Sequence, residues 1–358
     1  MKIKFIEAKT LKEKPEDSAL GFGDIFTDYM FNMDYSPEKG WYDARIEPYG
    51  PIMMDPSTQV LHYGQSVFEG LKAYKTQAGE VQLFRAKDNL KRLHQSAKRL
   101  SMPDMDEDFL FEALKKLLDI ERDWIPSTRG TSLYIRPAII AMDTCVGLRT
   151  SLTYRLFIIL SPVGAYYSEG FDPVKIWVTT EHVRAVRGGL GEAKTAGNYA
   201  ASLYASDLAI KDGYTQVLWL DAVELKYVEE VGAMNIFFVI GDELVTPELN
   251  GSILAGVTRN SVIQLAKSWG LKVSERRVRI DEIFDAHAKG ELKEVFGSGT
   301  AAIISPVGMI KHNDMEITIN EGKVGDLSSK LFEEIMNIQY GISEDPFGWV
   351  LPVARKQG

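Results

Sequence analysis

The sequence predicts a two-domain α+β protein. Its 358 residues exceed the usual size of one compact domain and suit two. Apolar, β-branched and aromatic runs at 133–142 and 152–160 have the composition of buried strands, and a new run of strands begins at 174–180. Helical spacing places Leu110, Leu114 and Leu117 on one face of a helix. We therefore expect strands and helices in both halves of the chain.

A short segment with Pro162 and Gly164 lies between two strand-like runs and marks the domain boundary. We expect a small N-terminal α+β domain at 1–161, an interdomain linker at 162–173 and a large C-terminal domain at 174–358. The larger domain would carry Lys194, the residue around which the candidate chemistry is organised.

The first domain opens with short extended segments. Strand character is present at 42–45 and 58–62, and prolines interrupt the chain between them. A strand at 81–84 precedes a helix from 88 to about 100, and the helix with the leucine face follows. Strands at 133–142 and 152–160 complete this domain.

The second domain begins with the strand at 174–180. A helix is expected at 198–211, followed by strands at 216–220 and 235–240. Another helix follows Gly256, and a strand near 295 runs into a Gly-Ser-Gly-Thr turn. The last helix carries Leu327, Leu331, Ile335 and Ile338 on one face.

The composition argues against several classes of protein. The formal net charge of −9 disfavours a nucleic-acid-binding surface, and no window is apolar enough to span a membrane. Residues 1–7 lack the apolar core of a signal peptide. Cys145 alone cannot form an internal disulfide, and no Cys and His cluster has metal-ligand spacing. We expect a cytoplasmic enzyme without a metal, a nucleic-acid partner or a membrane anchor.

Lys194 lies between the glycines of 188–191 and Gly197, just before a predicted helix. Glycine lets the backbone come close to a ligand. A lysine in this setting suits a Schiff base with a cofactor, and it equally suits a flexible surface loop. Taken alone, the stretch favours the surface lysine.

Two stretches of the second half have features of phosphate sites. Gly256, Val257 and Thr258 lie at a predicted helix start, where backbone N–H groups and the helix dipole favour an anion. The Gly-Ser-Gly-Thr turn at 297–300 adds turn amides and two hydroxyls. Each alone is more often a helix cap or a turn, but both beside Lys194 favour a phosphorylated cofactor.

Pyridoxal phosphate matches this combination, because it needs a lysine, an anion pocket and an acid facing its pyridine nitrogen. Glu229 and Glu230 lie just ahead of a predicted strand and supply such an acid. A charged pair at a strand entrance is the alternative interpretation.

An ordered series of motifs across nearly the whole chain resembles the branched-chain amino acid aminotransferases. These are pyridoxal-phosphate enzymes of fold type IV, the D-amino-acid aminotransferase-like two-domain α+β fold. The motifs are Leu-His-Tyr-Gly-Gln-Ser-Val-Phe-Glu-Gly-Leu-Lys at 61–72, Leu-Phe-Arg at 83–85, Ser-Leu-Tyr-Ile-Arg-Pro at 132–137, Lys194 with Gly-Asn-Tyr at 197–199, Glu-Val-Gly-Ala-Met-Asn at 230–235, Leu-Ala-Gly-Val-Thr-Arg at 254–259 and Glu-Val-Phe-Gly-Ser-Gly-Thr-Ala at 294–301.

The resemblance implies a set of cofactor-binding residues. Lys194 would be the catalytic lysine, bonded to pyridoxal phosphate and moving a proton between substrate and cofactor. Glu230, rather than Glu229, would pair with the pyridine nitrogen, and Tyr199 would donate to the phenolate oxygen. The implied phosphate ligands are Arg85, Val257, Thr258 and Thr300.

The resemblance also implies reversible amino transfer between leucine, isoleucine or valine and 2-oxoglutarate, giving glutamate and a branched 2-oxo acid. Arg136 would bind the second carboxylate of the acidic substrate. The amides of Ala301 and Ala302 would bind the other carboxylate, with help from Tyr63. A homodimer is expected, because the family places the position of Leu148 over the partner's pocket. The implied aromatic pocket residues are Phe22, Tyr63, Phe68, Tyr134 and Tyr166.

One departure from the family concerns redox control. Eukaryotic members carry a Cys-x-x-Cys pair after the Gly-Ser-Gly-Thr-Ala turn, where this chain has Ala302 and Ser305, so we expect no redox switch. Two alternatives share the fold, a D-amino-acid aminotransferase and an aminodeoxychorismate lyase, and the match at Tyr134 and Arg136 argues against both. A third is a pseudoenzyme with a scaffold role, which the presence of Lys194 disfavours.

Overall fold

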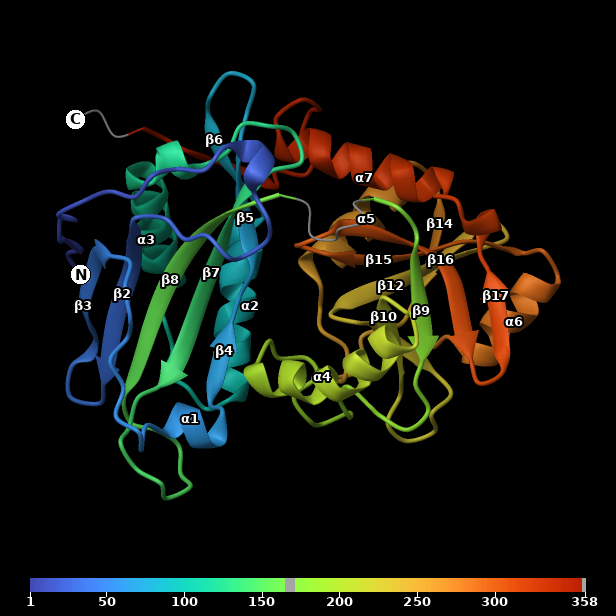
Figure 1. The fold of residues 1–358 in the computed structure, drawn as a ribbon, viewed down its shortest axis with the longest axis horizontal. Coiled ribbons are helices and arrows are strands. Elements are labelled where there is room, and N and C mark those ends of the chain that lie inside the picture. Colours follow the sequence, from blue (N-terminus) through green and yellow to red (C-terminus); the bar gives the residue numbers. More distant parts are fainter. Residues whose placement is uncertain (165–170, 356–358) are drawn as a thin grey trace. The chain divides into compact units, whose positions relative to one another are not determined.

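The computed structural model describes residues 1–164 and 171–355, and the chain forms two compact units (Figure 1). Unit 1 consists of Met1–Tyr166, Ala193–Ala196 and Met336–Gly358, and unit 2 of Tyr167–Glu192 and Gly197–Ile335. Lys194 therefore belongs to unit 1, although the chain on both sides of its segment belongs to unit 2. The C-terminal segment also belongs to unit 1.

Unit 1 is built on a nine-stranded sheet of order β1-β3-β2-β8-β7-β5-β6-β18, with β4 paired to β7. The pairing of β1 with β3 is parallel, and the other pairings are antiparallel. The strands are β1 (Lys4–Phe5), β2 (Tyr29–Ser36), β3 (Gly40–Pro48), β4 (Ser66–Phe68), β5 (Leu71–Lys75), β6 (Val81–Phe84), β7 (Ser132–Ala141), β8 (Tyr154–Val163) and β18 (Val350–Val353).

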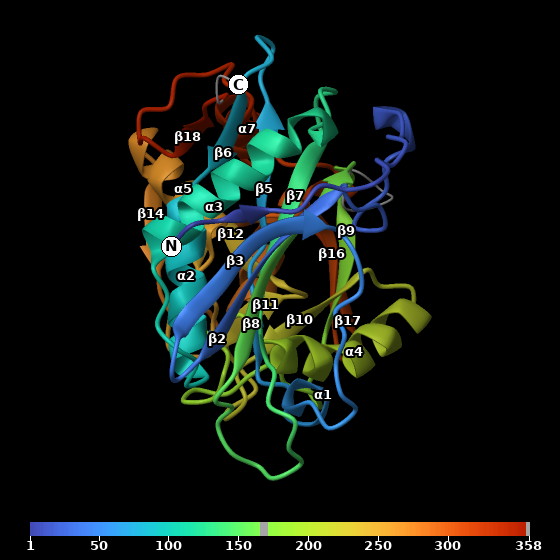
Figure 2. The ribbon, with the colours of Figure 1, turned by 90° about the vertical axis from the view of Figure 1, so that its left-hand side faces the viewer.

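Helices α2 (Ala86–Arg99) and α3 (Glu107–Ile120) pack against one face of this sheet (Figure 2). Leu90 of α2 and Leu114 of α3 are fully buried in the shared core, and each such side chain contributes about 1.5–3 kcal/mol of burial free energy. Asp106 caps α3 by accepting from the N–H of Phe109 at 2.9 Å.

A short helix, α1 (Gln59–Tyr63), occupies the position where a strand was expected at 58–62. The prediction was wrong because five residues are too few for their apolar spacing to distinguish a strand from one helical turn. Gly64 ends the helix in the left-handed conformation, at φ 61°. Three-residue 3-10 turns occur at Asp17–Ala19, Arg122–Trp124 and Asn320–Gly322.

Unit 2 contains a second nine-stranded sheet, of order β11-β10-β9-β16-β15-β12-β13-β14, with β17 paired to β16. An additional pairing of β11 with β12 closes the six strands from β11 to β12 into a ring. The strands are β9 (Val174–Val178), β10 (Gln216–Leu220), β11 (Val228–Val231), β12 (Met234–Ile240), β13 (Glu243–Thr246), β14 (Lys272–Glu275), β15 (Leu292–Gly299), β16 (Ile303–His312) and β17 (Met315–Thr318).

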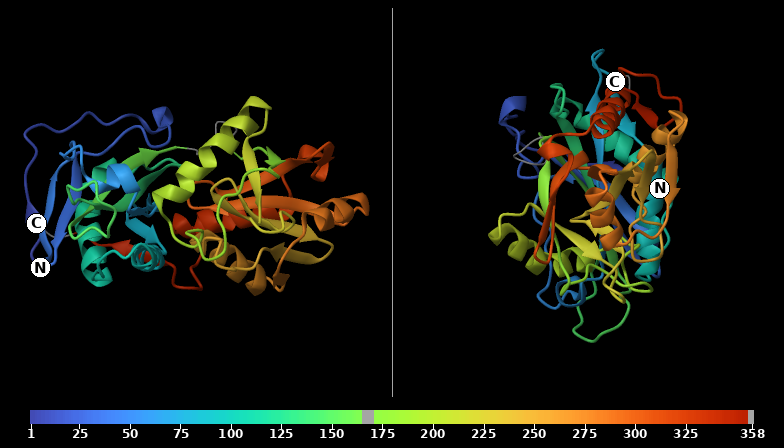
Figure 3. Two further views of the ribbon diagram at one scale, coloured as in Figure 1. Left: turned by 90° about the horizontal axis from the view of Figure 1, so that it is seen from below. Right: turned by 90° about the vertical axis from the view of Figure 1, so that its right-hand side faces the viewer.

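Four helices accompany this sheet: α4 (Ala196–Lys211), α5 (Val257–Ser268), α6 (Ile280–Ala288) and α7 (Asp326–Gln339). Helix α4, yellow-green in Figure 3, packs through Ala205 and Ala209 against Trp219 of β10. Glu294 caps α7 by accepting from the N–H groups of Leu327 and Ser328, each at 2.9 Å. Within the described ranges, no helix has the length and apolar character needed to cross a membrane.

Most of the expected elements are confirmed, including the strands at 81–84 and 216–220 and the helix after Gly256. The acids at 229–230, expected ahead of a strand, lie within a strand of their own, β11. Strand β8 continues to Val163, two residues beyond the expected end of the first domain at 161.

Candidate active site

The backbone around Lys194 is fixed within unit 1. Its carbonyl oxygen accepts from the N–H of Phe68 at 3.0 Å, and its own N–H donates to Oγ of Ser96 at 2.9 Å. The hydroxyl of the next residue, Thr195, donates to the carbonyl of Ser66 at 2.7 Å. Strand β4 and helix α2 thus hold the main chain of the lysine by hydrogen bonds. A flexible surface loop would lack such hydrogen bonds.

The side chain of Lys194 lies beside an aromatic ring that a second cation also contacts. Its Nζ is 5.1 Å from the ring centroid of Phe68, and the guanidinium of Arg136 is 4.7 Å from the same centroid. Lys194 is half-buried. The ring of Phe68 therefore links the candidate catalytic lysine to the candidate substrate pocket.

Arg136 is oriented by a tyrosine on its own strand. Its Nη2 donates to the hydroxyl of Tyr134 at 3.1 Å, and the Tyr134 ring packs edge-on against Phe22 with centroids 5.2 Å apart. Within the described part of the chain, the buried Nε of Arg136 has no hydrogen-bond partner. Since buried donors are normally satisfied, this one is suited to an anionic ligand. The structure thus brings together the predicted residues Phe22, Phe68, Tyr134 and Arg136.

Two further residues shape this group. Lys72 of β5 is the cross-strand partner of Tyr134, so both side chains lie on the same face of the sheet. Burial lowers the pKa of Lys72 to about 8. A Cβ at Gly70 would overlap the hydroxyl of Tyr134, so glycine is needed there for the tyrosine to reach Arg136.

Tyr63 lies with the loop between β7 and β8, which carries Leu148. Leu148 is 80% exposed, and the hydroxyl of Tyr63 donates to the carbonyl of Val146 in the same loop. Nε2 of Gln59 adds a hydrogen bond to Gly147 at 3.2 Å. Helix α1 and this loop are therefore joined by hydrogen bonds at the surface of unit 1. Tyr166, the remaining aromatic residue predicted for the pocket, lies outside the described residues.

Arg85 follows β6 and is the N-cap of α2, in the left-handed conformation at φ 52°. Its Nε pairs with Asp88 at 2.7 Å, and its guanidinium lies 5.4 Å from the ring centroid of Trp349. A cation at a helix N-terminus opposes the helix dipole. The position is therefore unfavourable for stability alone, and it suits an anionic ligand.

In unit 2 the predicted cofactor residues converge on Asn235 of β12. Asn235 is in register with Glu230 of β11 on one side and with Ser298 of β15 on the other. Its Nδ2 donates to the carbonyl of Leu254 at 2.9 Å, and the N–H of Leu254 donates to Oε1 of Glu230 at 2.7 Å. The candidate ring acid, the Gly-Ser-Gly-Thr turn and the segment before α5 thus meet at one residue.

The start of α5 fits a phosphate. Gly256 is the N-cap and makes no side-chain cap hydrogen bond, and a Cβ there would overlap Oδ1 of Asn235. The buried Oγ of Ser298 also lacks a partner among the described residues. Helical N–H groups without a side-chain cap, together with the dipole, favour an anion. The residues present therefore fit the phosphate group of the cofactor.

Glu229 and Glu230 have different surroundings. The side chain of Glu230 is 4% exposed, and its Oε1 lies 3.2 Å from Nη2 of Arg184. Oε1 of Glu229 accepts from the hydroxyl of Ser252. Burial raises the pKa of Glu229, while the Ser252 hydrogen bond and the charge of Arg184 oppose the rise. The stronger ionic contact belongs to Glu230, which supports its choice as the ring acid.

The other predicted residues of unit 2 lie on α4 and in the turn between β15 and β16. Tyr199 is half-buried on α4, and Thr258 is buried in α5. The half-buried turn residues are Thr300, Ala301 and Ala302. In the part of the chain that the structure describes, no group of three or more His, Cys, Asp or Glu side chains is arranged to hold a metal.

Four residues around the site were not predicted as site residues: Lys72, Ser96, Arg184 and Asn235. Lys72 had a signal, since it ends the motif at 61–72. Asn235 had a signal, since it ends the motif at 230–235. Ser96 and Arg184 had none, because each contacts the site through the fold, and Ser96 is 98 positions from Lys194.

Comparison with known proteins gives a consistent result. Residues 66–310 match the family described as amino-transferase class IV. Branched-chain-amino-acid aminotransferase 2 of Bacillus subtilis (strain 168) is 57% identical over 345 residues, which are 96% of this chain and 95% of that protein. A probable branched-chain-amino-acid aminotransferase of Staphylococcus aureus (strain N315) is 58% identical over 354 residues, 99% of each chain.

Solved structures agree with these relatives. A branched-chain amino acid aminotransferase of Escherichia coli superposes with a TM-score of 0.76 at 28% identity, covering 91% of this chain and 99% of that one. The enzyme from Thermobaculum terrenum, in its PLP form, gives a TM-score of 0.74 at 26% identity and covers 91% and 98% of the two chains.

Proposed function

This chain belongs to the amino-transferase class IV family, and from that premise we propose that it is a branched-chain-amino-acid aminotransferase. It moves an amino group reversibly between leucine, isoleucine or valine and 2-oxoglutarate, with pyridoxal phosphate as cofactor. The structural observation that carries the proposal is the anchored Arg136 among aromatic rings. Apolar walls suit an aliphatic side chain, and the guanidinium suits an acidic one.

Pyridoxal phosphate supplies an electron-withdrawing ring and a phosphate group by which it is held. The carboxylate of Glu230 would pair with the ring nitrogen and keep it protonated, and Tyr199 would donate to the phenolate oxygen. The phosphate ligands are Arg85, Val257, Thr258 and Thr300. Two observations in unit 2 support this assignment. Gly256 begins α5 as its N-cap, and hydrogen bonds join Asn235 to Leu254 and Leu254 to Glu230.

Lys194 is the catalytic residue. Its Nζ would hold the cofactor in the resting enzyme and would move the proton at the substrate Cα during turnover. The hydrogen bonds to Ser96 and Phe68 hold its main chain, which restricts the positions that Nζ can reach. Such restriction favours proton transfer, because a correctly placed base needs no further reorganisation.

The substrate is oriented by its charged groups. The amides of Ala301 and Ala302 bind the carboxylate next to the reacting carbon, and the guanidinium of Arg136 binds the second carboxylate of glutamate or 2-oxoglutarate. Phe22, Phe68 and Tyr134 surround the aliphatic side chain of the other substrate.

The proposal includes a homodimer, in which the Leu148 loop of one subunit covers the pocket of the other. Leu148 is 80% and Val146 65% exposed in a loop whose base is fixed by Asp143, which accepts from the N–H groups of Leu152 and Thr153. Because Tyr63 is bonded to this loop, it would reach the same pocket from the partner. A cytoplasmic location is part of the proposal, since the lone cysteine gives no disulfide framework.

The experiment compares Lys194→Ala with Lys211→Ala, a change at an exposed lysine in the last turn of α4. Glutamate formation from leucine and 2-oxoglutarate should vanish in Lys194→Ala and stay normal in Lys211→Ala. Bound cofactor, followed by its visible absorbance, should decrease only partly, because the phosphate ligands remain. Normal turnover by Lys194→Ala would overturn the assignment.

A panel of amino donors tests the choice among enzymes of this fold. The three branched L-amino acids should be used in preference to their D-isomers, with 2-oxoglutarate as acceptor. Preference for D-donors would replace the proposal with D-amino-acid aminotransferase activity, and failure with all donors would favour a lyase or a scaffold.

A further inference from the structure

The guanidinium of Arg184 is almost fully buried beside the candidate ring acid. The side chains of Arg184 and Glu230 are 8% and 4% exposed, and Nη2 of Arg184 lies 3.2 Å from Oε1 of Glu230. The same Nη2 donates to the carbonyl of Gly191 at 3.3 Å and to the carbonyl of Ser252. Oε1 of Glu230 also accepts from the N–H of Leu254 at 2.7 Å.

These contacts join three separate segments of unit 2: the glycine-rich stretch before Lys194, strand β11 and the segment before α5. The first and third are in close backbone contact, because a Cβ at Gly191 would overlap the carbonyl of Ser252. Glycine therefore allows one guanidinium to reach two carbonyl groups and a carboxylate. This arrangement holds Oε1 of Glu230 from two directions, by the guanidinium and by the Leu254 amide.

Stability alone does not account for this cluster. Burying an arginine and a carboxylate costs about as much desolvation free energy as their attraction returns. Nε of Arg184 and Oε2 of Glu229 are both buried without a hydrogen-bond partner among the residues that the structure describes. Buried polar atoms are normally satisfied when their role is structural. The cluster therefore keeps the ion pair of Arg184 with Glu230 but leaves some of its buried polar atoms without a hydrogen bond from the described residues.

The neighbouring acid, Glu229, has a different hydrogen-bond partner, because its Oε1 accepts from the hydroxyl of Ser252. Burial raises the pKa of Glu229, with the Ser252 hydrogen bond and the charge of Arg184 opposing the rise. Arginine stays charged at any working pH, and the ion pair of its Nη2 at 3.2 Å is with Oε1 of Glu230. The cluster thus pairs one permanent cation with one carboxylate.

We propose that Arg184 is a positioning residue, which fixes the Glu230 carboxylate in its ionised form for the ring nitrogen of the cofactor. The inference rests on the proposed function, because Glu230 needs this form only if pyridoxal phosphate binds. The electron-withdrawing power of the ring depends on a proton at that nitrogen, so the charge of Arg184 acts on catalysis through Glu230.

Three variants and a control test the proposal. Arg184→Met removes the charge, Arg184→Lys keeps it, and Glu230→Gln removes the acid. The control is Arg122→Met, at a buried arginine of unit 1 that pairs with Asp119 at 3.2 Å and donates to the carbonyl of Val353 at 2.7 Å. Thermal unfolding of each apoprotein reports the purely structural cost.

Arg184→Met should lower kcat about 10- to 100-fold, by analogy with the loss of an outer-shell partner at a metal site, and should change the KM for leucine much less. It should also shift the pH dependence of the visible absorbance of bound pyridoxal phosphate and weaken apoprotein affinity for that cofactor, measured by equilibrium dialysis. Arg184→Lys should restore most of the kcat, of the absorbance profile and of the cofactor affinity. Arg122→Met should lower thermal stability and leave kcat, the absorbance profile and the cofactor affinity unchanged.

A double-mutant cycle decides whether Arg184 acts through Glu230. Adding Arg184→Met to Glu230→Gln should cost little further kcat, because two residues that work as one unit are not additive. Additive losses would overturn the proposal, as would an unchanged absorbance profile in Arg184→Met. If Arg184→Met does not fold, Arg184→Gln takes its place in the cycle. Absence of amino transfer in the unmodified enzyme would instead refute the proposed function.

Discussion

The hydroxyl of Tyr134 accepts a hydrogen bond from Nη2 of Arg136, two positions further along strand β7, at 3.1 Å. Residues i and i+2 of a strand lie on the same face, so the strand itself brings the two side chains together. The guanidinium also lies 5.3 Å from the Tyr134 ring centroid. These neighbours of the cation are neutral groups, so within the described residues its charge suits an anionic ligand.

Replacing Arg136 with Leu should raise the KM for 2-oxoglutarate about 10- to 100-fold, the equivalent of a charge-assisted hydrogen bond of about 1.5–3 kcal/mol. The KM for leucine should change much less, because leucine has no second carboxylate. Tyr134→Phe keeps the aromatic ring and removes only the acceptor, so its effect should have the same direction and be smaller. Equal losses for both substrates in Arg136→Leu would assign Arg136 a structural role.

The two adjacent acids of β11 should respond differently to the same substitution. Glu230→Gln should reduce kcat far more than cofactor affinity, because an amide cannot keep the ring nitrogen protonated. Glu229→Gln should have a small effect, because Oε1 of Glu229 accepts from the hydroxyl of Ser252, a hydrogen bond that an amide oxygen can also accept. The measurement is steady-state kcat beside cofactor affinity and thermal stability for each variant. If Glu229→Gln is the damaging change, the assignment is one residue out of register.

The sequence predicted the long, regular elements and the identity of the motifs, because both depend on local patterns. Strand 216–220 agrees with β10 to the residue, whereas 58–62 failed because five residues hold too little periodicity. The way motifs meet could not be predicted, since it depends on strand register. Asn235 joins Glu230 to Ser298 only because β12 pairs with both β11 and β15.

Glu121 makes the stability of unit 1 depend on pH. It is buried and accepts from the N–H of Tyr29. Burial raises its pKa from 4.5 to about 7, and the charge of Asp28 adds to the rise, while hydrogen bonds from Tyr29 and Thr27 and the charge of Lys14 oppose it. Between these pH values the folded protein keeps a proton that the unfolded chain releases. The free energy of unfolding therefore falls as pH rises through this window and levels off above it.

Glu121→Gln should remove this dependence while keeping an acceptor for Tyr29. Between pH 5 and pH 8 the unmodified protein should lose up to about 3 kcal/mol relative to the variant, from about 1.4 kcal/mol per pKa unit. Urea denaturation at a series of pH values provides the measurement. Parallel profiles for the two proteins would show that Glu121 does not titrate in this range.

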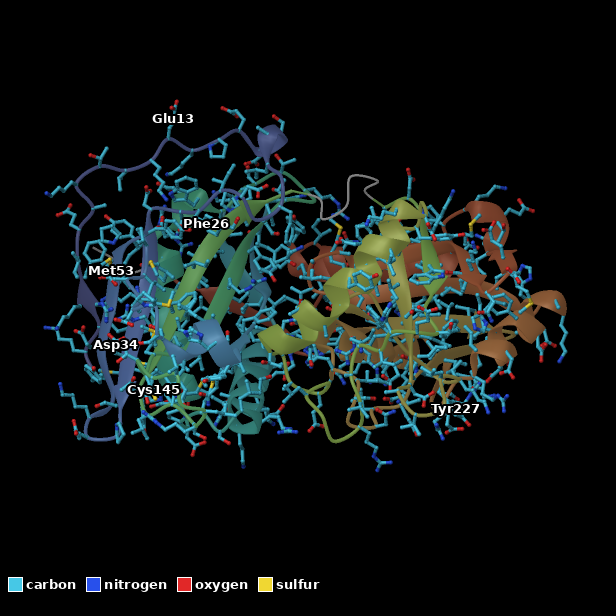
Figure 4. All side chains as sticks on the ribbon, turned by 60° about the horizontal axis from the view of Figure 1, so that its bottom comes forward. Glu13, Phe26, Asp34, Met53, Cys145 and Tyr227 are labelled. Carbon is cyan, nitrogen blue, oxygen red and sulfur yellow. The ribbon has the colours of Figure 1, made fainter. Side chains whose placement is uncertain are left out.

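Cys145 is half-buried, in the loop that carries Leu148 (Figure 4). The N–H of Gly147 donates to its Sγ at 3.2 Å, so the thiol interacts with its own loop. It is the only cysteine of the sequence, and oxidation can only cap it or cross-link two subunits.

We therefore expect mild peroxide or a thiol-blocking reagent to leave initial turnover nearly unchanged. The positions that carry the eukaryotic Cys-x-x-Cys pair hold Ala302 and Ser305, which cannot form a disulfide. Cys145→Ser, treated in the same way, is the control, because serine keeps the size of the side chain and cannot react. A large loss in the unmodified chain that Cys145→Ser escapes would contradict redox indifference. That outcome would mean that modification of Cys145 displaces the loop, and that catalysis depends on the position of Leu148.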